Sequence, residues 1–165
     1  TAPLKHAAFE ICQEVTLQAD GLRAVNTLRI RDGRIEGHNT DMLALIEMAK
    51  ELTGEVWLWG GSGVRSSVRA AFPGVKEFSA RTGLPRPGTS DISAPAVLIW
   101  ATGRGNEFIW PPESVKTGMV LDLNYTDDSP GLEWAAAHNL PYQSGLKMFK
   151  LQAGFQRLYW QQIPR

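Results

Sequence analysis

The sequence has little cysteine and no net charge, and each lack excludes a class of protein. Cys12 is the only cysteine in 165 residues, so a disulfide framework within the chain and a thiolate-based structural zinc site are both excluded. Seventeen Lys and Arg against seventeen Asp and Glu leave no electrostatic basis for binding nucleic acid or an anionic membrane. The three histidines show no metal-ligand spacing, so we expect no metal site. A single thiol fits a reducing compartment, and we expect a cytoplasmic protein.

Long apolar runs and a leader sequence are also lacking. The longest apolar runs, such as 95–101, are too short to span a bilayer, so no membrane association is expected. The chain opens on Thr1 and shows no signal-peptide pattern, which indicates a processed start or a piece of a longer chain. Hydrophobic residues make up 43% of the chain and include six tryptophans. That content supports a packed core and excludes a disordered chain.

The first third of the chain predicts helices on either side of a hairpin. Apolar residues at helical spacing predict a helix over 6–19. Two extended runs, 24–30 and 34–38, flank Asp32-Gly33, a pair favoured in tight hairpin turns. A second helix is expected from Thr40 to about residue 52.

From residue 55 onward, strand and helix patterns alternate. The expected strands are 56–59, 75–79, 96–100, 119–123 and 141–143, and the expected helices are 67–72, 132–138 and 148–161. The clearest strands are almost wholly apolar, which is typical of strands buried on both faces of a parallel sheet. The alternation therefore predicts an α/β fold with a parallel sheet and flanking helices.

A glycine-rich loop, Gly60-Gly61-Ser62-Gly63, lies between the first of these strands and the next helix. Glycines let a backbone turn tightly and approach a pyrophosphate, and a helix start supplies free N–H groups. Compared with the motif G-x-G-x-x-G, Ser62 replaces the second glycine and Arg65 the third. The loop predicts a dinucleotide site, with a plain strand-to-helix turn as the alternative.

The end of the second strand indicates which dinucleotide is bound. NAD-binding folds place an acidic residue about 20 positions after the first glycine, where it holds the ribose hydroxyl. Here that position is Ala80, followed by Arg81 and Thr82. A guanidinium binds a 2′-phosphate through two hydrogen bonds, so NADP is favoured over NAD, and Arg86 is placed to assist. The alternative is that Arg81 is a solvated loop charge.

Five further motifs follow one another along the chain. They are Thr1-Ala2-Pro3-Leu4-Lys5, Ala24-Val25-Asn26-Thr27-Leu28, Gly37-His38-Asn39-Thr40-Asp41, Asp122-Leu123-Asn124-Tyr125, and Gly145-Leu146-Lys147-Met148 running on to Gln152-Ala153. Together with the glycine loop and residues 80–82, they resemble shikimate dehydrogenases from residue 1 to about residue 160. The resemblance implies a Rossmann-like parallel sheet with flanking helices plus a remnant of an α/β substrate domain. It also implies an oxidoreductase of aromatic amino-acid (chorismate) biosynthesis that reversibly reduces 3-dehydroshikimate to shikimate with NADPH.

The same resemblance implies roles for individual residues. Lys5 matches the catalytic lysine and Asp41 its catalytic aspartate partner. The implied substrate contacts are Thr1, Asn26, Tyr125 and Gln152. The cofactor contacts, with Arg65 and Arg86 added from their charge, are Gly60, Gly61, Ser62, Gly63, Arg65, Ala80, Arg81, Thr82, Arg86, Ala101, Thr102, Gly145 and Met148. The chemistry fits these residue types, because a ketone that accepts hydride needs a proton donor beside its oxygen, and a lysine ammonium is one.

The resemblance also sets the expected domains. Residues 1–40 are expected to be part of a substrate-binding domain, 41–147 an NADP-binding domain, and 148–165 a helix that returns to the substrate domain. Family members extend upstream of the lysine motif, so a chain of these residues alone should expose apolar surface and self-associate or bind the missing segment. Two alternatives stay open, namely a non-catalytic nucleotide-binding or scaffold module and a dehydrogenase of quinate-like polyols.

Overall fold

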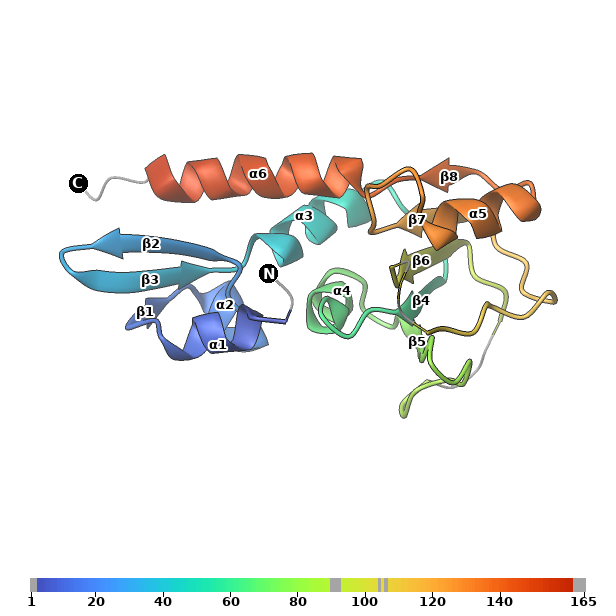
Figure 1. The fold of residues 1–165 in the computed structure, drawn as a ribbon, viewed down its shortest axis with the longest axis horizontal. Helices are drawn as coiled ribbons and strands as arrows, with labels where there is room; N and C mark the ends of the chain where they lie inside the picture. Colours follow the sequence, from blue (N-terminus) through green and yellow to red (C-terminus); the bar gives the residue numbers. More distant parts are fainter. Residues whose placement is uncertain (1–2, 90–92, 104, 106, 162–165) are drawn as a thin grey trace.

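The computed structural model describes residues 3–89, 93–103, 105 and 107–161, so Thr1 lies outside the described residues. The first part of the chain forms a small three-stranded sheet with two short helices (Figure 1). Its elements are α1 (Lys5–Glu10), β1 (Glu14–Val15), α2 (Leu17–Leu22), β2 (Thr27–Arg31) and β3 (Arg34–His38). β3 lies in the middle, parallel to β1 and antiparallel to β2.

The single helix expected over 6–19 is wrong. The segment instead forms α1, β1 and α2, because it pairs with the free edge of β3. The Gln13 N–H donates to the Ile35 carbonyl at 2.9 Å, and the Thr16 N–H donates to the Gly37 carbonyl at 3.0 Å. Thr16 then caps α2 through its hydroxyl oxygen. Pairing with a distant strand outweighs a weak local helical pattern.

The hairpin predicted around Asp32 and Gly33 is confirmed. Both residues have positive φ, 50° and 76°, as a tight primed turn requires. Arg31 pairs with Arg34 across this turn. Strand β2 begins later than expected, at Thr27. The preceding segment turns back toward the chain start, and its Val25 N–H donates to the Lys5 carbonyl at 2.9 Å.

The remaining strands form the predicted Rossmann-like parallel sheet. They are β4 (Val56–Gly60), β5 (Lys76–Phe78), β6 (Val97–Ala101), β7 (Met119–Asp122) and β8 (Tyr142–Gln143), in the order β5-β4-β6-β7-β8. All neighbouring pairs are parallel. The chain runs from β4 outward to β5 and then back to β6 on the other side of β4. Ligands of open α/β sheets bind at this reversal, beyond the carboxyl ends of the strands.

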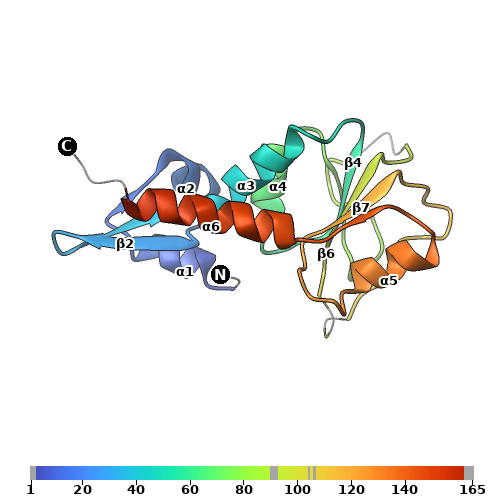
Figure 2. The same ribbon diagram turned by 90° about the horizontal axis from the view of Figure 1, so that it is seen from above.

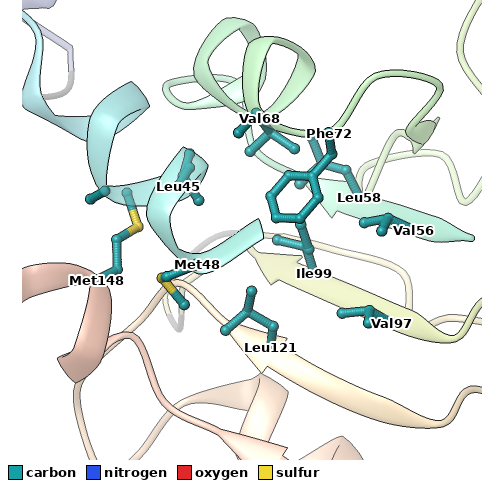
Figure 3. Packing of buried hydrophobic residues seen from close by; sticks show 12 residues of the cluster. Leu45, Met48, Val56, Leu58, Val68, Phe72, Val97, Ile99, Leu121 and Met148 are labelled. Atoms are coloured by element: carbon teal, nitrogen blue, oxygen red, sulfur yellow. The ribbon is translucent and has the colours of Figure 1, made fainter. Parts of the chain in front are cut away.

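One face of this sheet is covered by helices α3 (Thr40–Ala49), α4 (Arg65–Ala71) and α6 (Leu146–Gln161). Figure 3 shows the core between them, in which Leu45 and Met48 of α3 face strand side chains such as Leu58 and Ile99. Helix α6 runs along the molecule from this core to the small sheet (Figures 1 and 2). Its far end contacts β2, where the indole N–H of Trp160 donates to the Leu28 carbonyl at 2.9 Å.

The opposite face of the sheet is covered mainly by aromatic side chains and by α5 (Pro130–Ala137). The described residues of the connections 79–96 and 102–118 form no helix. The buried rings of this face are Trp57, Trp59, Phe78, Trp100 and Trp134. Phe108, from one of the loops, meets the Trp100 ring edge-on with 5.7 Å between ring centroids. Large rings therefore fill the volume that crossover helices occupy in other sheets of this type.

Helices α3 and α6 both connect the two sheets. The division into residues 1–40, 41–147 and 148–165 stays a prediction. Within the described residues, every helix is too short or too polar to cross a membrane.

Candidate active site

Lys5 lies between the start of α3 and the glycine loop. Its ammonium forms an ion pair with the Asp41 carboxylate and donates a hydrogen bond of 3.1 Å to the Gly63 carbonyl. Asp41, in the first turn of α3, is only 3% exposed. The predicted pair therefore comes together although 36 residues separate its members. The Gly63 contact also ties it to the parallel-sheet part of the molecule.

Asn26 fixes the other side of the Asp41 carboxylate. Its side-chain N–H donates to Asp41 Oδ1 at 2.8 Å. Its Oδ1 in turn accepts from the Thr40 N–H at 3.0 Å and from the Thr27 hydroxyl at 2.9 Å. The α3 start is itself capped by the side chain of Asn39. Both oxygens of Asp41 therefore accept hydrogen bonds from groups that are themselves anchored.

The Lys5–Asp41 pair lines a cavity of about 330 Å³, which we call the lysine cavity. Seven predicted residues meet around it, namely Lys5, Asn26, Asp41, Tyr125, Gly145, Met148 and Gln152. The cavity is also lined by four residues that the sequence motifs did not predict, namely Val64, Leu123, Phe149 and Gln156. Phe149 and Gln156 lie three residues before and four after Gln152, and that spacing on α6 was the signal for their shared face.

A second cavity, of about 880 Å³, opens at the carboxyl ends of β4 and β6, and we call it the glycine-loop cavity. Its lining includes the predicted residues Gly60, Gly61, Ser62, Ala80, Arg81, Thr82, Arg86, Ala101 and Thr102. Ser79, Gly105 and Glu107 line it as well. Four predicted cofactor contacts lie elsewhere. Gly145 and Met148 line the lysine cavity, the Gly63 carbonyl faces Lys5, and the Arg65 Nε lies 3.5 Å from the buried Glu77 carboxylate.

The glycine loop leaves room for a ligand to approach its backbone. Gly60 and Gly61 have φ values of 89° and 79°, which side-chain-bearing residues rarely adopt. A Cβ added to Gly61 would lie 3.2 Å from the Ala101 Cβ. The backbone N–H groups of Ser62 and Gly63 donate to no atom in the described part of the chain. The loop therefore offers free donors to an anion.

Two arginines face the same cavity. Arg81 is exposed at its rim. The Nε–H of Arg86 is buried and has no hydrogen-bond partner among the described residues. A buried donor without a partner is costly unless an acceptor joins it. A phosphate oxygen is the acceptor that a guanidinium binds best.

The described residues contain no cluster of metal-ligating side chains. Within the described residues, no three His, Cys, Asp or Glu side chains gather closely enough to hold an ion.

Known proteins resemble this chain in sequence and in fold. No protein-family model matches the sequence. A relative named shikimate dehydrogenase (NADP(+)), from Xylella fastidiosa strain M12, is 30% identical over 196 residues, which span 97% of this chain and 70% of the relative. The chain belongs to the shikimate dehydrogenase family. A family member of the same name from Methylobacillus flagellatus is 28% identical, with 99% of this chain and 73% of the relative covered.

Solved structures show the same relationship. A shikimate 5-dehydrogenase from Thermus thermophilus, in complex with NADP(H) and shikimate, matches with a TM-score of 0.79 and 26% identity. The match covers 98% of this chain and 71% of that protein. A chorismate mutase/shikimate 5-dehydrogenase fusion protein from Clostridium acetobutylicum shares the fold, with a TM-score of 0.76 and 22% identity over the whole of this chain. The shikimate dehydrogenase family and the Rossmann-like sheet predicted from the sequence are both confirmed.

Proposed function

We propose that this chain interconverts shikimate and 3-dehydroshikimate with NADP, using Lys5 as the proton donor and acceptor. The observation that carries the proposal is the partly buried Lys5–Asp41 pair, which lines the lysine cavity and hydrogen-bonds the glycine loop beside the second cavity. The names of the relatives give NADP(+) as their cofactor, and the Thermus thermophilus relative was solved with NADP(H) and shikimate. We place the activity in the cytoplasm, where the thiol of Cys12 stays reduced.

The residues of the glycine-loop cavity fit a phosphorylated dinucleotide. The close-approach backbone at Gly60 and Gly61, with the free N–H groups of the next two residues, suits a pyrophosphate. Arg81 and the unpartnered Nε–H of Arg86 suit a 2′-phosphate. When bound, NADP supplies or accepts the hydride. Arg65 has no part in this proposal because it lies against Glu77.

Lys5 has one N–H left for the substrate. An ammonium carries three donors, of which one meets Asp41 and one meets the Gly63 carbonyl. During ketone reduction, the third N–H transfers its proton to the carbonyl oxygen as the carbonyl carbon gains hydride and the C=O π electrons move onto oxygen. In the reverse direction, neutral Lys5 removes the hydroxyl proton. Asp41 keeps Nζ oriented.

Neutral amides of the lysine cavity are suited to the substrate's hydroxyl groups. The side chains of Gln152 and Gln156 hydrogen-bond no other described residue, so their donors and acceptors are free. Asn26 donates one amide N–H to Asp41 and accepts from the Thr40 N–H, which leaves its second amide N–H for the substrate. Its proposed role is therefore both to hold Asp41 and to contact a substrate hydroxyl. Free amides that match hydroxyls discriminate strongly against analogues that lack them.

The test is a steady-state assay in which the chain receives shikimate and NADP⁺ and the nicotinamide absorbance is followed. We expect turnover with this pair, and slower turnover when NAD⁺ replaces NADP⁺ or quinate replaces shikimate. NADP⁺ binding without turnover would instead support a non-catalytic nucleotide-binding module. Preference for quinate would support the polyol dehydrogenase.

A further inference from the structure

Asp122 is a fully buried carboxylate at the carboxyl end of β7, outside the lining of both cavities. Its Oδ1 accepts two hydrogen bonds of 2.8 Å from Asn124, one from the backbone N–H and one from the side-chain amide. Its Oδ2 accepts from the Tyr142 hydroxyl at 3.0 Å and from the Ser129 hydroxyl. Burial raises the pKa of Asp122, while these donors oppose that shift. The carboxylate thus fixes Asn124 with two bonds.

Asn124 connects this hydrogen-bond network to the glycine-loop cavity. Its side-chain amide also donates to the Thr102 carbonyl at 3.0 Å. The same carbonyl accepts from the indole N–H of Trp100 at 2.7 Å. Thr102 is buried and lines the glycine-loop cavity just beyond β6. The position of this wall therefore depends directly on the Asn124 side chain.

The main chain of Asn124 reaches the other cavity. Its carbonyl accepts from the Gly145 N–H at 2.8 Å, and Gly145 lines the lysine cavity at the start of α6. A Cβ on Gly145 would lie 2.6 Å from the Leu123 carbonyl, so only glycine permits this approach. Tyr125, the next residue in the chain, also lines the lysine cavity. One residue thus bonds a wall of each cavity.

We propose that Asn124, held by Asp122, is a positioning residue that sets the distance between the two cavities. The inference rests on the proposed function, in which a ketone in the lysine cavity must meet the nicotinamide bound in the glycine-loop cavity. Hydride transfer requires the reacting carbons in contact, and a displacement of about 1 Å can cost about a hundredfold in rate. Asn124 itself touches neither reacting atom.

The experiment compares Asn124→Ala with Tyr142→Phe. The first change breaks the bond to Thr102, whereas the second removes a donor to Oδ2 of Asp122, the carboxylate oxygen that does not bind Asn124. We expect Asn124→Ala to lower kcat by at least about tenfold, with the Kd values of NADP⁺ and shikimate each changed by less than about threefold. Tyr142→Phe should keep kcat within about twofold, although its melting temperature should fall by as much as that of Asn124→Ala.

Asp122→Asn is a second variant that separates charge from position. The N–H groups of Asn124 can only donate, whereas the hydroxyls of Ser129 and Tyr142 can turn to accept. The new amide should therefore keep its oxygen toward Asn124, and kcat should stay within about threefold of the unmodified chain. Equal losses of kcat in Asn124→Ala and Tyr142→Phe would overturn the inference and leave the proposed function intact. Absence of turnover in the unmodified chain would overturn both.

Discussion

At the scale of single residues, Arg86 is the side chain whose environment indicates a bound ligand most clearly. Its buried Nε–H has no acceptor in the described chain, and it faces the glycine-loop cavity together with Arg81. Arg69, in contrast, has its guanidinium on the buried Glu77. One arginine is therefore available to an anion, and the other is part of a structural ion pair.

Arg86→Ala should weaken NADP⁺ much more than NAD⁺. A charge-assisted hydrogen bond is worth about 1.5–3 kcal/mol, so the Kd of NADP⁺ should rise about tenfold or more while that of NAD⁺ barely changes. Titration calorimetry with both dinucleotides measures this ratio. Arg69→Ala is the matched control, and a ratio that changes equally in both variants would contradict a phosphate contact at Arg86.

His38 makes stability depend on pH. Burial lowers the pKa of His38, whose Nδ1 lies 2.7 Å from the Thr16 hydroxyl and whose ring stacks on Tyr159. The unfolded chain takes up this proton near pH 6.5, whereas the folded chain does so only at lower pH. The free energy of unfolding should therefore fall as the pH drops below about 6.5, until the folded pKa is reached. His38→Gln should flatten this part of the curve in thermal unfolding from pH 7 to 5, and an unchanged slope would contradict it.

At the scale of elements, the glycine loop depends on a close contact between β4 and β6. Gly61 has positive φ and would place a Cβ against Ala101 and Leu58, whereas Gly74 has a similar φ of 83° with nothing within 4 Å. Gly61→Ala should therefore cost about 1–3 kcal/mol more than the backbone strain that Gly74→Ala alone introduces. Chemical unfolding of both variants measures the difference. Equal losses would show that φ alone, rather than the cradle, requires glycine.

Several elements could be predicted because their signals are local. The Asp32-Gly33 turn and the wholly apolar β4 are read from a few adjacent residues. The helix expected over 6–19 failed because the decisive interaction is with the edge of β3, whose position the local pattern does not contain. Asp122 escaped the site prediction for the same reason, since its partners Ser129 and Tyr142 come from other elements. Likewise, Arg65 was expected at a phosphate, and only the fold reveals Glu77 beside it.

At the scale of the whole molecule, the two sheets differ in how well they are covered. The parallel sheet has helices on one face and aromatic rings on the other. Around the small sheet, apolar side chains of β2 and of the adjoining end of α6 are exposed to solvent, namely Leu28, Ile30, Leu158 and Trp160. Apolar side chains left open in this way promote association between molecules.

The chain should therefore self-associate through β2. Ile30 is 76% exposed, so Ile30→Thr removes apolar surface while keeping a residue that favours strands. Analytical ultracentrifugation should show a concentration-dependent mass for the unmodified chain and a lower mass for this variant. The control is Leu84→Ser, at a 63% exposed position outside the small sheet, which should leave the measured mass unchanged. A monomer at all concentrations would contradict the prediction.

The central claim is that Lys5 supplies the proton while the glycine-loop cavity binds the dinucleotide. The most direct measurement compares kcat and the Kd of NADP⁺ between the unmodified chain and Lys5→Ala, with shikimate as substrate. We predict that kcat falls by about a hundredfold or more, as expected for a lost general acid–base, while the Kd stays within about threefold. A variant that keeps its kcat, or that loses cofactor affinity as strongly as turnover, would contradict the claim.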